Sequence, residues 1–196
     1  MPLDELDRIE ISCVSDLVSF VRENAKRVYH SNVNAMTWYR GQENYEWHLS
    51  PAVYRDNQFQ YESLYIKELE RIRPAEFVNC SNFDKLVKMQ HYGLPTRLLD
   101  VTSNPLVALF FACNSHREID GALYCFLNSP TFWEDNWAVQ IVTDYVMNPT
   151  NSINELIRRG KDRLPASLKN ESAWEAVFWF PSSFRLVCNS ISKGFP

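Results

Sequence analysis

Three short segments of the chain carry polar side chains that could bind an anion or do acid–base chemistry. The first is "WYRGQ", in which Arg40 follows two aromatic residues and precedes Gly41. An arginine fork there can bind a carboxylate, phosphate or pyrophosphate through two parallel hydrogen bonds. The same side chain could instead pair with an internal aspartate and lock a turn, as structural ion pairs often do.

The second segment is "MQHYGLPTRLLDVTSNPLVALFFAC", residues 89–113, in which polar residues gather before an apolar run. Thr102 and Ser103 fall just before the expected start of a helix, whose free N–H groups favour anions. Each residue also has a purely structural interpretation. His91 could cap a helix C-terminus, Arg97 could pair with Asp100, and Ser103 could be an N-cap.

The third segment is "ESAWEAVFWFPSSFRLV", where Glu171 and Glu175 precede a strongly apolar run. Glu175 could lie at a sheet edge beside a cleft and act there as a carboxylate. The alternative is that both acids are solvated at the end of a helix or loop.

Composition narrows the class of protein. The chain has 196 residues with a net charge of −4, so it has no bulk attraction for phosphate backbones or anionic membranes. The motifs of serine hydrolases, phosphate loops and zinc proteases are absent. Its five cysteines are scattered without metal-like spacing and predict neither a zinc site nor a disulfide framework: Cys13, Cys80, Cys113, Cys125 and Cys188. With no signal-like N-terminus and no apolar run of membrane length, we expect a reduced, cytoplasmic protein without membrane contact.

Hydrophobic periodicity predicts the first half of the fold. Helices are expected over 15–30, capped by Ser15, over 61–74, ended by Pro74, and over 82–93, capped by Asn82 and stopped by Gly93. A strand is expected over Met36–Arg40, broken by Gly41.

The second half is expected to contain a strand over 96–101 and then a helix over 105–113, capped by Asn104 or Ser103 and nearly fully buried because it is apolar on every side. A strand over 122–127, a helix over 152–159 and a terminal hairpin around residues 181–183 follow. This mixture predicts a single α+β domain over 1–196, a mixed sheet with helices packed around it.

The motifs of the central region resemble those of the FRG domain. They are "YRGQ", then Trp47, Leu49, Pro51 and Arg55, then "QHYGLPTRLLDVTSNPLVALFFAC" and "DGALYCF". The similarity covers about residues 38–126, with Tyr39 in place of the Phe of the family motif. At the end of the chain, Arg185 and Leu186 fit the family pattern, although the Gln that follows in other members is missing. The resemblance implies a mostly bacterial family of stand-alone proteins or fused modules.

A more distant similarity is to ADP-ribosyltransferases of the Arg–Ser–Glu type. The order of Arg40, then Thr102 and Ser103 before a "VALFFA" helix, then Glu175, is similar to theirs. The triplet reads Val-Thr-Ser rather than Ser-Thr-Ser, and the two acids are four residues apart. This similarity implies an ADP-ribosyltransferase-like core.

The same resemblance implies roles for these residues. Arg40 would hold the pyrophosphate of NAD, Ser103 would orient the glutamate, and His91 or Tyr92 would stack on the nicotinamide. Glu175 would stabilise an oxocarbenium-like ribose, as carboxylates do at glycosidic bonds. The implied catalytic residues are Arg40, Ser103 and Glu175, and the implied NAD-binding residues are Arg40, Gln42, His91, Tyr92, Arg97 and Thr102.

Three functions therefore stay open. The first is an NAD-consuming ADP-ribosyltransferase or NAD glycohydrolase that acts on a protein or nucleic acid as a bacterial toxin or phage-defence effector, with an antitoxin or fused partner. The second is a non-catalytic module that binds a nucleotide or nucleic-acid end with Arg40, Arg97 and the start of the 105–113 helix. The third is an interaction scaffold, which accounts for the aromatic content but not for the polar residues.

Overall fold

The structure is a computed structural model that describes residues 7–28, 35–114, 118–130, 132–150, 152–161 and 185–191. The chain divides into two compact units. Unit 1 comprises residues 1–49, 100–131 and 181–196, and unit 2 comprises residues 50–99 and 132–180. Each unit is built from stretches that are separated in the sequence. That the whole chain acts as a single domain stays a prediction.

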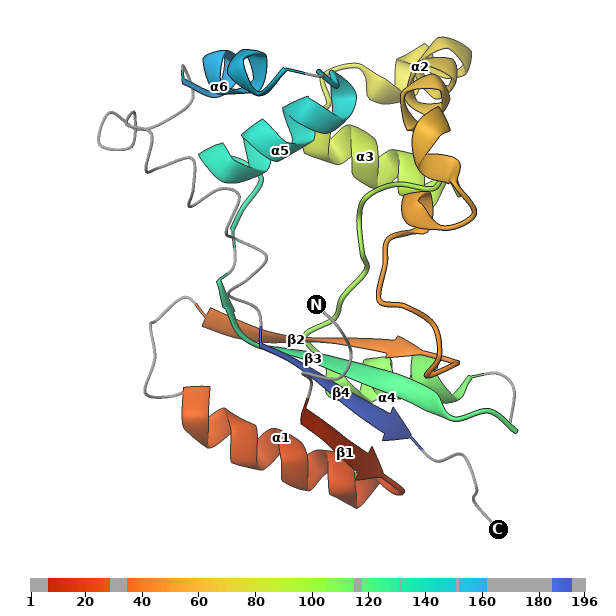
Figure 1. The fold of residues 1–196 in the computed structure, drawn as a ribbon, viewed down its shortest axis with the longest axis vertical. Coiled ribbons are helices and arrows are strands. Elements are labelled where there is room, and N and C mark those ends of the chain that lie inside the picture. The colour runs from red at the N-terminus through yellow and green to blue at the C-terminus, as the bar shows by residue number, and fades with distance from the viewer. Residues whose placement is uncertain are drawn as a thin grey trace. The chain divides into compact units, whose positions relative to one another are not determined.

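Unit 1 is organised by a four-stranded sheet in the order β1-β4-β3-β2 (Figure 1). Its strands are β1 (Asp7–Ile11), β2 (Ala35–Gln42), β3 (Gly121–Pro130) and β4 (Arg185–Ile191). β3 pairs antiparallel with both β2 and β4, while β1 runs parallel to β4. The sheet is therefore mixed, and the predicted α+β class is confirmed.

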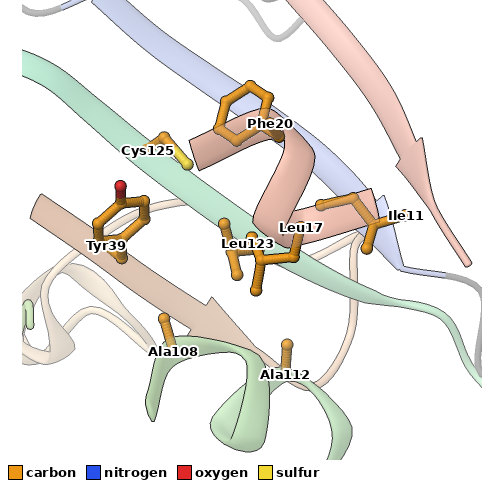
Figure 2. Close-up of a cluster of buried hydrophobic side chains, with 8 residues drawn as sticks. All are labelled: Ile11, Leu17, Phe20, Tyr39, Ala108, Ala112, Leu123 and Cys125. Atoms are coloured by element: carbon orange, nitrogen blue, oxygen red, sulfur yellow. The ribbon is translucent and has the colours of Figure 1, made fainter. Parts of the chain in front are cut away.

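Two helices of unit 1 share a core with this sheet: α1 (Val14–Val28) and α4 (Pro105–Cys113). Figure 2 shows side chains from both helices meeting side chains from the strands in one cluster: Ile11, Leu17, Phe20, Tyr39, Ala108, Ala112, Leu123 and Cys125. Leu17 and Leu123 are fully buried there. Of the apolar positions that predicted the first helix, Leu17 is buried in this core and Val21 packs against it.

The backbone of α4 lies unusually close to the sheet. A Cβ atom at Gly41 of β2 would lie 1.8 Å from the carbonyl oxygen of Ala108, and one at Gly121 would lie 2.3 Å from that of Ala112. Ala108 and Ala112 are fully buried and lie one helical turn apart. The two glycines and two alanines therefore let α4 pack directly on β2 and β3.

The prediction that this helix is nearly fully buried is wrong. The face of α4 away from the sheet is exposed, with Phe110 59% and Phe111 53% accessible, and Leu106 and Val107 are exposed with them. The reason is that the helix packs through its two alanines, with Leu109 beside them, which leaves the other large apolar side chains on faces that the sheet does not cover.

Unit 2 is helical in its described residues. It contains α2 (Glu62–Ile72), α3 (Asn82–His91), α5 (Trp137–Met147) and α6 (Ile153–Lys161), with short 3-10 turns at Ala52–Tyr54, Gln58–Tyr61 and Pro74–Phe77. Side chains from α2, α3, α5 and the third turn form its core: Ile66, Phe77, Leu86, Met89 and Val146. None of the described helices in either unit could span a bilayer.

Several local predictions need correction. Ser81, rather than Asn82, caps α3 in a reciprocal capping box with Asp84. Ser15 lies inside α1, and β2 continues through Gly41 to Gln42.

Larger differences concern whole elements. Residues 96–101 form no strand, and the isolated bridge that follows them is at Thr102. β1 and α5 were not predicted. Of the predicted terminal hairpin, β4 is observed, whereas the turn at residues 181–183 lies outside the described residues.

Candidate functional site in unit 1

Arg40 lies on β2, which is an edge strand of the sheet. It pairs with Tyr124 of β3, and Gln42 pairs with Ala122, so Arg40 and Gln42 lie on the same face of β2. One Arg40 nitrogen, Nη1, donates a hydrogen bond of 2.7 Å to the carbonyl oxygen of Asp100. This bond between residues sixty positions apart fixes the direction of the guanidinium group.

The Asp100 carbonyl is positioned by a short pairing beside β2. The N–H of Tyr39 donates to the carbonyl of Thr102 at 2.7 Å, and the N–H of Thr102 donates to the carbonyl of Tyr39 at 2.8 Å. These reciprocal bonds hold the stretch that leads into α4 along the free edge of β2. Two motifs of the sequence, "YRG" and "DVTSNP", are thereby brought side by side.

A pocket of about 260 Å³ opens between this pairing and α4. It is lined by residues of β2, of the 100–102 stretch and of α4: Tyr39, Arg40, Gly41, Asp100, Val101, Thr102, Ala108 and Phe111. Arg40 and Phe111 are both among the lining residues, so the residues around this pocket include a cation and a half-exposed aromatic ring. Such a combination can hold a phosphate beside a planar ring.

The backbone N–H groups at the start of α4 already donate to nearby side chains. Asn104 is the N-cap, and its side chain accepts from the N–H of Leu106 at 2.9 Å. The Thr102 hydroxyl oxygen accepts from the N–H of Asn104 at 3.1 Å, and Pro105 has no N–H to offer. Asn104, rather than Ser103, is therefore the residue that caps this helix, and Ser103 is exposed beside it.

Gln42 lies in the interior with a 4% exposed side chain. Its amide nitrogen donates to the carbonyl of Trp47 at 3.2 Å and contacts the hydroxyl of Tyr124 at 3.4 Å. Its amide oxygen accepts no hydrogen bond from the described residues. In this position Gln42 holds the 43–47 turn, and its contact with a nucleotide stays a prediction.

Arg97 belongs to unit 2 and pairs there with Glu62 rather than with Asp100. The guanidinium donates to both carboxylate oxygens, with Nη2 to Oε2 at 2.6 Å, and it stacks on the rings of Phe59 and Tyr145. Burial lowers the pKa of Arg97, but the bonds to Glu62 outweigh burial and leave the pKa raised. The pair joins the start of α2 to the stretch after α3.

His91 and Tyr92 end α3, also in unit 2. Both are exposed, their ring centroids are 6.2 Å apart, and the guanidinium of Arg73 lies 5.1 Å from the centre of the Tyr92 ring. Gly93 follows with φ of +86°, as predicted for the residue that stops this helix. Stacking of either ring on nicotinamide stays a prediction.

Glu175 and Glu171 lie outside the described residues. The convergence of Arg40, Ser103 and Glu175 in one cleft therefore remains a prediction. Within the part of the chain that the structure describes, no group of acidic, histidine or cysteine side chains could hold a metal ion.

Sequence reasoning missed two important residues. Phe111 was read only as part of an apolar run, although its place three residues after Ala108 puts it on a flank of the sheet-facing side. Glu62 gave no signal, because its partner Arg97 is 35 residues away.

Comparison with known proteins gives one match. Residues 35–121 match the model of the FRG domain family, a range that runs from the start of β2 to the start of β3. No curated protein and no solved structure matches the chain. The match includes every residue that lines the pocket.

Proposed function

We propose that the region that matches the FRG domain family, residues 35–121, binds a nucleotide in the pocket beside Arg40. The observation that carries the proposal is the bond that holds the Arg40 guanidinium to the carbonyl of Asp100, because both residues line the same pocket as Phe111. The fixed guanidinium would bind a phosphate oxygen, and the Phe111 ring would contact the base or another planar ring. A guanidinium oriented before the ligand arrives loses less freedom on binding.

The size of the pocket sets what part of a nucleotide enters it. Pockets for whole drug-sized ligands measure about 300–1,000 Å³, and this one measures about 260 Å³. It suits a phosphate with one attached ring or ribose rather than both halves of a dinucleotide. We expect the rest of a larger ligand to extend beyond the pocket.

NAD is the nucleotide that we propose, with cleavage of its nicotinamide–ribose bond as a second candidate function. The support is the order of Arg40, Thr102, Ser103 and Glu175 along the sequence, which is similar to that of ADP-ribosyltransferases. Arg40 would bind the pyrophosphate, and Glu175 would supply the carboxylate that stabilises positive charge on the ribose. A toxin or phage-defence role follows only if NAD is consumed.

Calorimetric titration of NAD, ADP-ribose and AMP into the full chain tests the binding proposal. We expect Arg40→Gln to raise the Kd at least about tenfold, because a hydrogen bond to a charged group contributes roughly 1.5–3 kcal/mol. Arg55→Gln is the matched control. Arg55 also donates to a backbone carbonyl, that of Ser50 at 2.9 Å, but lies outside the pocket. Equal affinity in the wild type and Arg40→Gln would contradict the proposal.

Release of labelled nicotinamide from NAD tests the catalytic candidate separately. We expect Glu175→Gln to abolish release while leaving NAD affinity close to that of the wild type, with Glu171→Gln as the control at the neighbouring acid. If the wild type binds NAD without releasing nicotinamide, the chain is a binding module. Release that survives Glu175→Gln would remove this residue from the catalytic set.

A further inference from the structure

We propose that Cys80 and Lys88 of unit 2 form a site at which a peroxide oxidises the thiol. Cys80 lies directly before Ser81, the N-cap of α3, and Lys88 lies about two turns into that helix. The Nζ atom of Lys88 is 3.2 Å from the Sγ atom of Cys80. Long side chains on a helix lean towards its N-terminus, and this brings the ammonium group back to the sulfur.

A second contact holds the ammonium group of Lys88 in place. Its Nζ atom donates to the carbonyl oxygen of Glu76 at 2.8 Å, in the 3-10 turn Pro74–Phe77. The hydrogen bond to Cys80 is the first cause of the raised pKa of Lys88, so the amine stays charged at neutral pH. A cation is therefore fixed beside the sulfur.

The backbone on either side of Cys80 holds its side chain. Asn79 has a φ of +60°, in the left-handed region that asparagine tolerates better than most residues. Ser81 then begins α3 with a reciprocal capping box. The thiol contacts the carbonyl oxygens of Glu76 and Val78 at 3.6 and 3.8 Å. Cys80 is partly exposed, which gives a small reagent access to it.

These surroundings favour the reactive form of the sulfur. The thiolate is the nucleophile, and reactive cysteines lie partly exposed beside a lysine or at the start of a helix. A unit positive charge 3.2 Å away raises the share of thiolate roughly tenfold even in water. Each such thiolate is about threefold less nucleophilic, so the net gain in rate is about threefold.

The oxidation changes the sulfur in one step. The thiolate forms a bond to one oxygen of hydrogen peroxide, and the O–O bond breaks. The other oxygen leaves as hydroxide and takes up the proton that the thiol released, so the products are a sulfenic acid and water. The sulfur loses two electrons, which the peroxide gains. An external thiol can restore the cysteine through a disulfide.

Cys13 in unit 1 provides an internal comparison. It is also partly exposed, but its thiol contacts the carboxylate of Asp16 and the hydroxyl of Ser15. A negative charge beside a sulfur disfavours the thiolate, whereas the ammonium group beside Cys80 favours it. The two cysteines therefore have similar access and neighbours of opposite charge.

Trapping with dimedone, which labels sulfenic acids, tests the inference on the full chain. Hydrogen peroxide is added at pH 7 below one equivalent, and peptide mass spectrometry follows the label at each cysteine. We expect Cys80 to be labelled at least about threefold faster than Cys13. This preference should disappear in urea, where the fold no longer holds the lysine beside the sulfur.

Two variants of Lys88 identify the cause of the preference. Lys88→Gln removes the cation and should abolish the preference for Cys80, whereas Lys88→Arg should keep it. Lys85→Gln is the matched control, because Lys85 lies on the same helix and binds the carboxylate of Glu70 at 2.7 Å.

Circular dichroism melting shows whether each variant is folded. If Lys88→Gln is unfolded, the comparison of the wild type in buffer and in urea decides the question alone. Labelling of Cys80 that is no faster than that of Cys13 would overturn the inference. A preference that persists in urea, or that a folded Lys88→Gln variant retains, would overturn it as well.

Discussion

At the scale of single residues, the pair of Glu62 and Arg97 is the least exposed ion pair among the described residues of unit 2. The Glu62 side chain is 6% exposed and that of Arg97 is 19% exposed. Removing one member of a buried pair strands the other charge, which costs about 3–5 kcal/mol. We therefore expect Glu62→Ala to lower the free energy of unfolding by about this amount in urea denaturation.

Glu68 on the same helix provides the control for this prediction. Its carboxylate also binds an arginine, Arg71, at 2.8 Å, but its side chain is 47% exposed. Water screens such a pair, so Glu68→Ala should lower the free energy of unfolding far less than Glu62→Ala does. Equal losses for the two variants would show that Arg97 finds another partner or reaches water.

Tyr39 gives the folded state a dependence on alkaline pH. Burial, with a smaller contribution from Cys125, raises the pKa of Tyr39 from 10.0 to about 12. The unfolded chain therefore loses the phenolic proton first, so stability is complete below pH 10 and falls as the pH rises towards 12. At about 1.4 kcal/mol per unit, the loss reaches roughly 2–3 kcal/mol.

Tyr39→Phe isolates this effect from other alkaline titrations. We expect the difference in free energy of unfolding between wild type and Tyr39→Phe to change between pH 10 and pH 12, in the direction of a relatively less stable wild type. Denaturant titrations at several pH values in this window provide the measurement. A difference that is constant across the window would mean that the phenol ionises as readily in the folded state.

At the scale of elements, the contact between α4 and β2 predicts a strong difference between two glycines. Gly41→Ala would push a Cβ into the Ala108 carbonyl, which lies only 1.8 Å from that position. Because the obstacle is backbone, we expect a loss of at least about 3 kcal/mol, at or beyond the upper end for overpacking. Thermal or urea unfolding of the variant provides the measurement.

Gly93→Ala is the comparison for this substitution. Its φ of +86° disfavours a side chain, but a Cβ there would meet no atom within 4 Å. The cost should therefore be that of the backbone conformation alone, about 1–2 kcal/mol. A larger loss at Gly93 than at Gly41 would contradict the close packing of α4.

The sequence pattern predicted where the helices lie better than it predicted which of their faces are buried. The spacing of apolar residues located α1 and α2, because each places a stripe on a core. Capping and stop residues located α3 and α4. The pattern failed for the exposure of α4, because a helix without polar residues gives no sign of which face packs. It also failed at residues 96–101, where the apolar residues Leu98 and Leu99 gave strand character. Leu98 instead packs against the core of unit 2.

At the scale of the whole molecule, the sequence did not predict two units. No linker-like composition marks the points where the chain passes between them, after Leu49, Leu99, Thr131 and Phe180. For the same reason the candidate site could be predicted only in part. The sequence placed Arg40 and Thr102 among the important residues, whereas the pairing of Tyr39 with Thr102 and the bond from Arg40 to the Asp100 carbonyl appear only in the fold.

The alternation of the chain between the units predicts that their stabilities are linked. Unfolding of unit 2 would turn residues 50–99 into a flexible loop between two parts of unit 1, which adds a loop-closure cost to unit 1. We expect Glu62→Ala, in unit 2, to speed amide hydrogen exchange in β3 of unit 1. Exchange in β3 that matches the wild type, alongside faster exchange in α2, would show that the units open independently.

The backbone pairing of Tyr39 with Thr102 has a consequence for how this sequence can vary in length. Register at that edge is set by two hydrogen bonds between fixed neighbours, of 2.7 and 2.8 Å, and not by the number of residues between them. Insertions or deletions between positions 50 and 99 therefore leave Arg40 opposite the Asp100 carbonyl. The helical segment between these positions could therefore be replaced by a different one, and we expect the pocket to stay intact in such a graft.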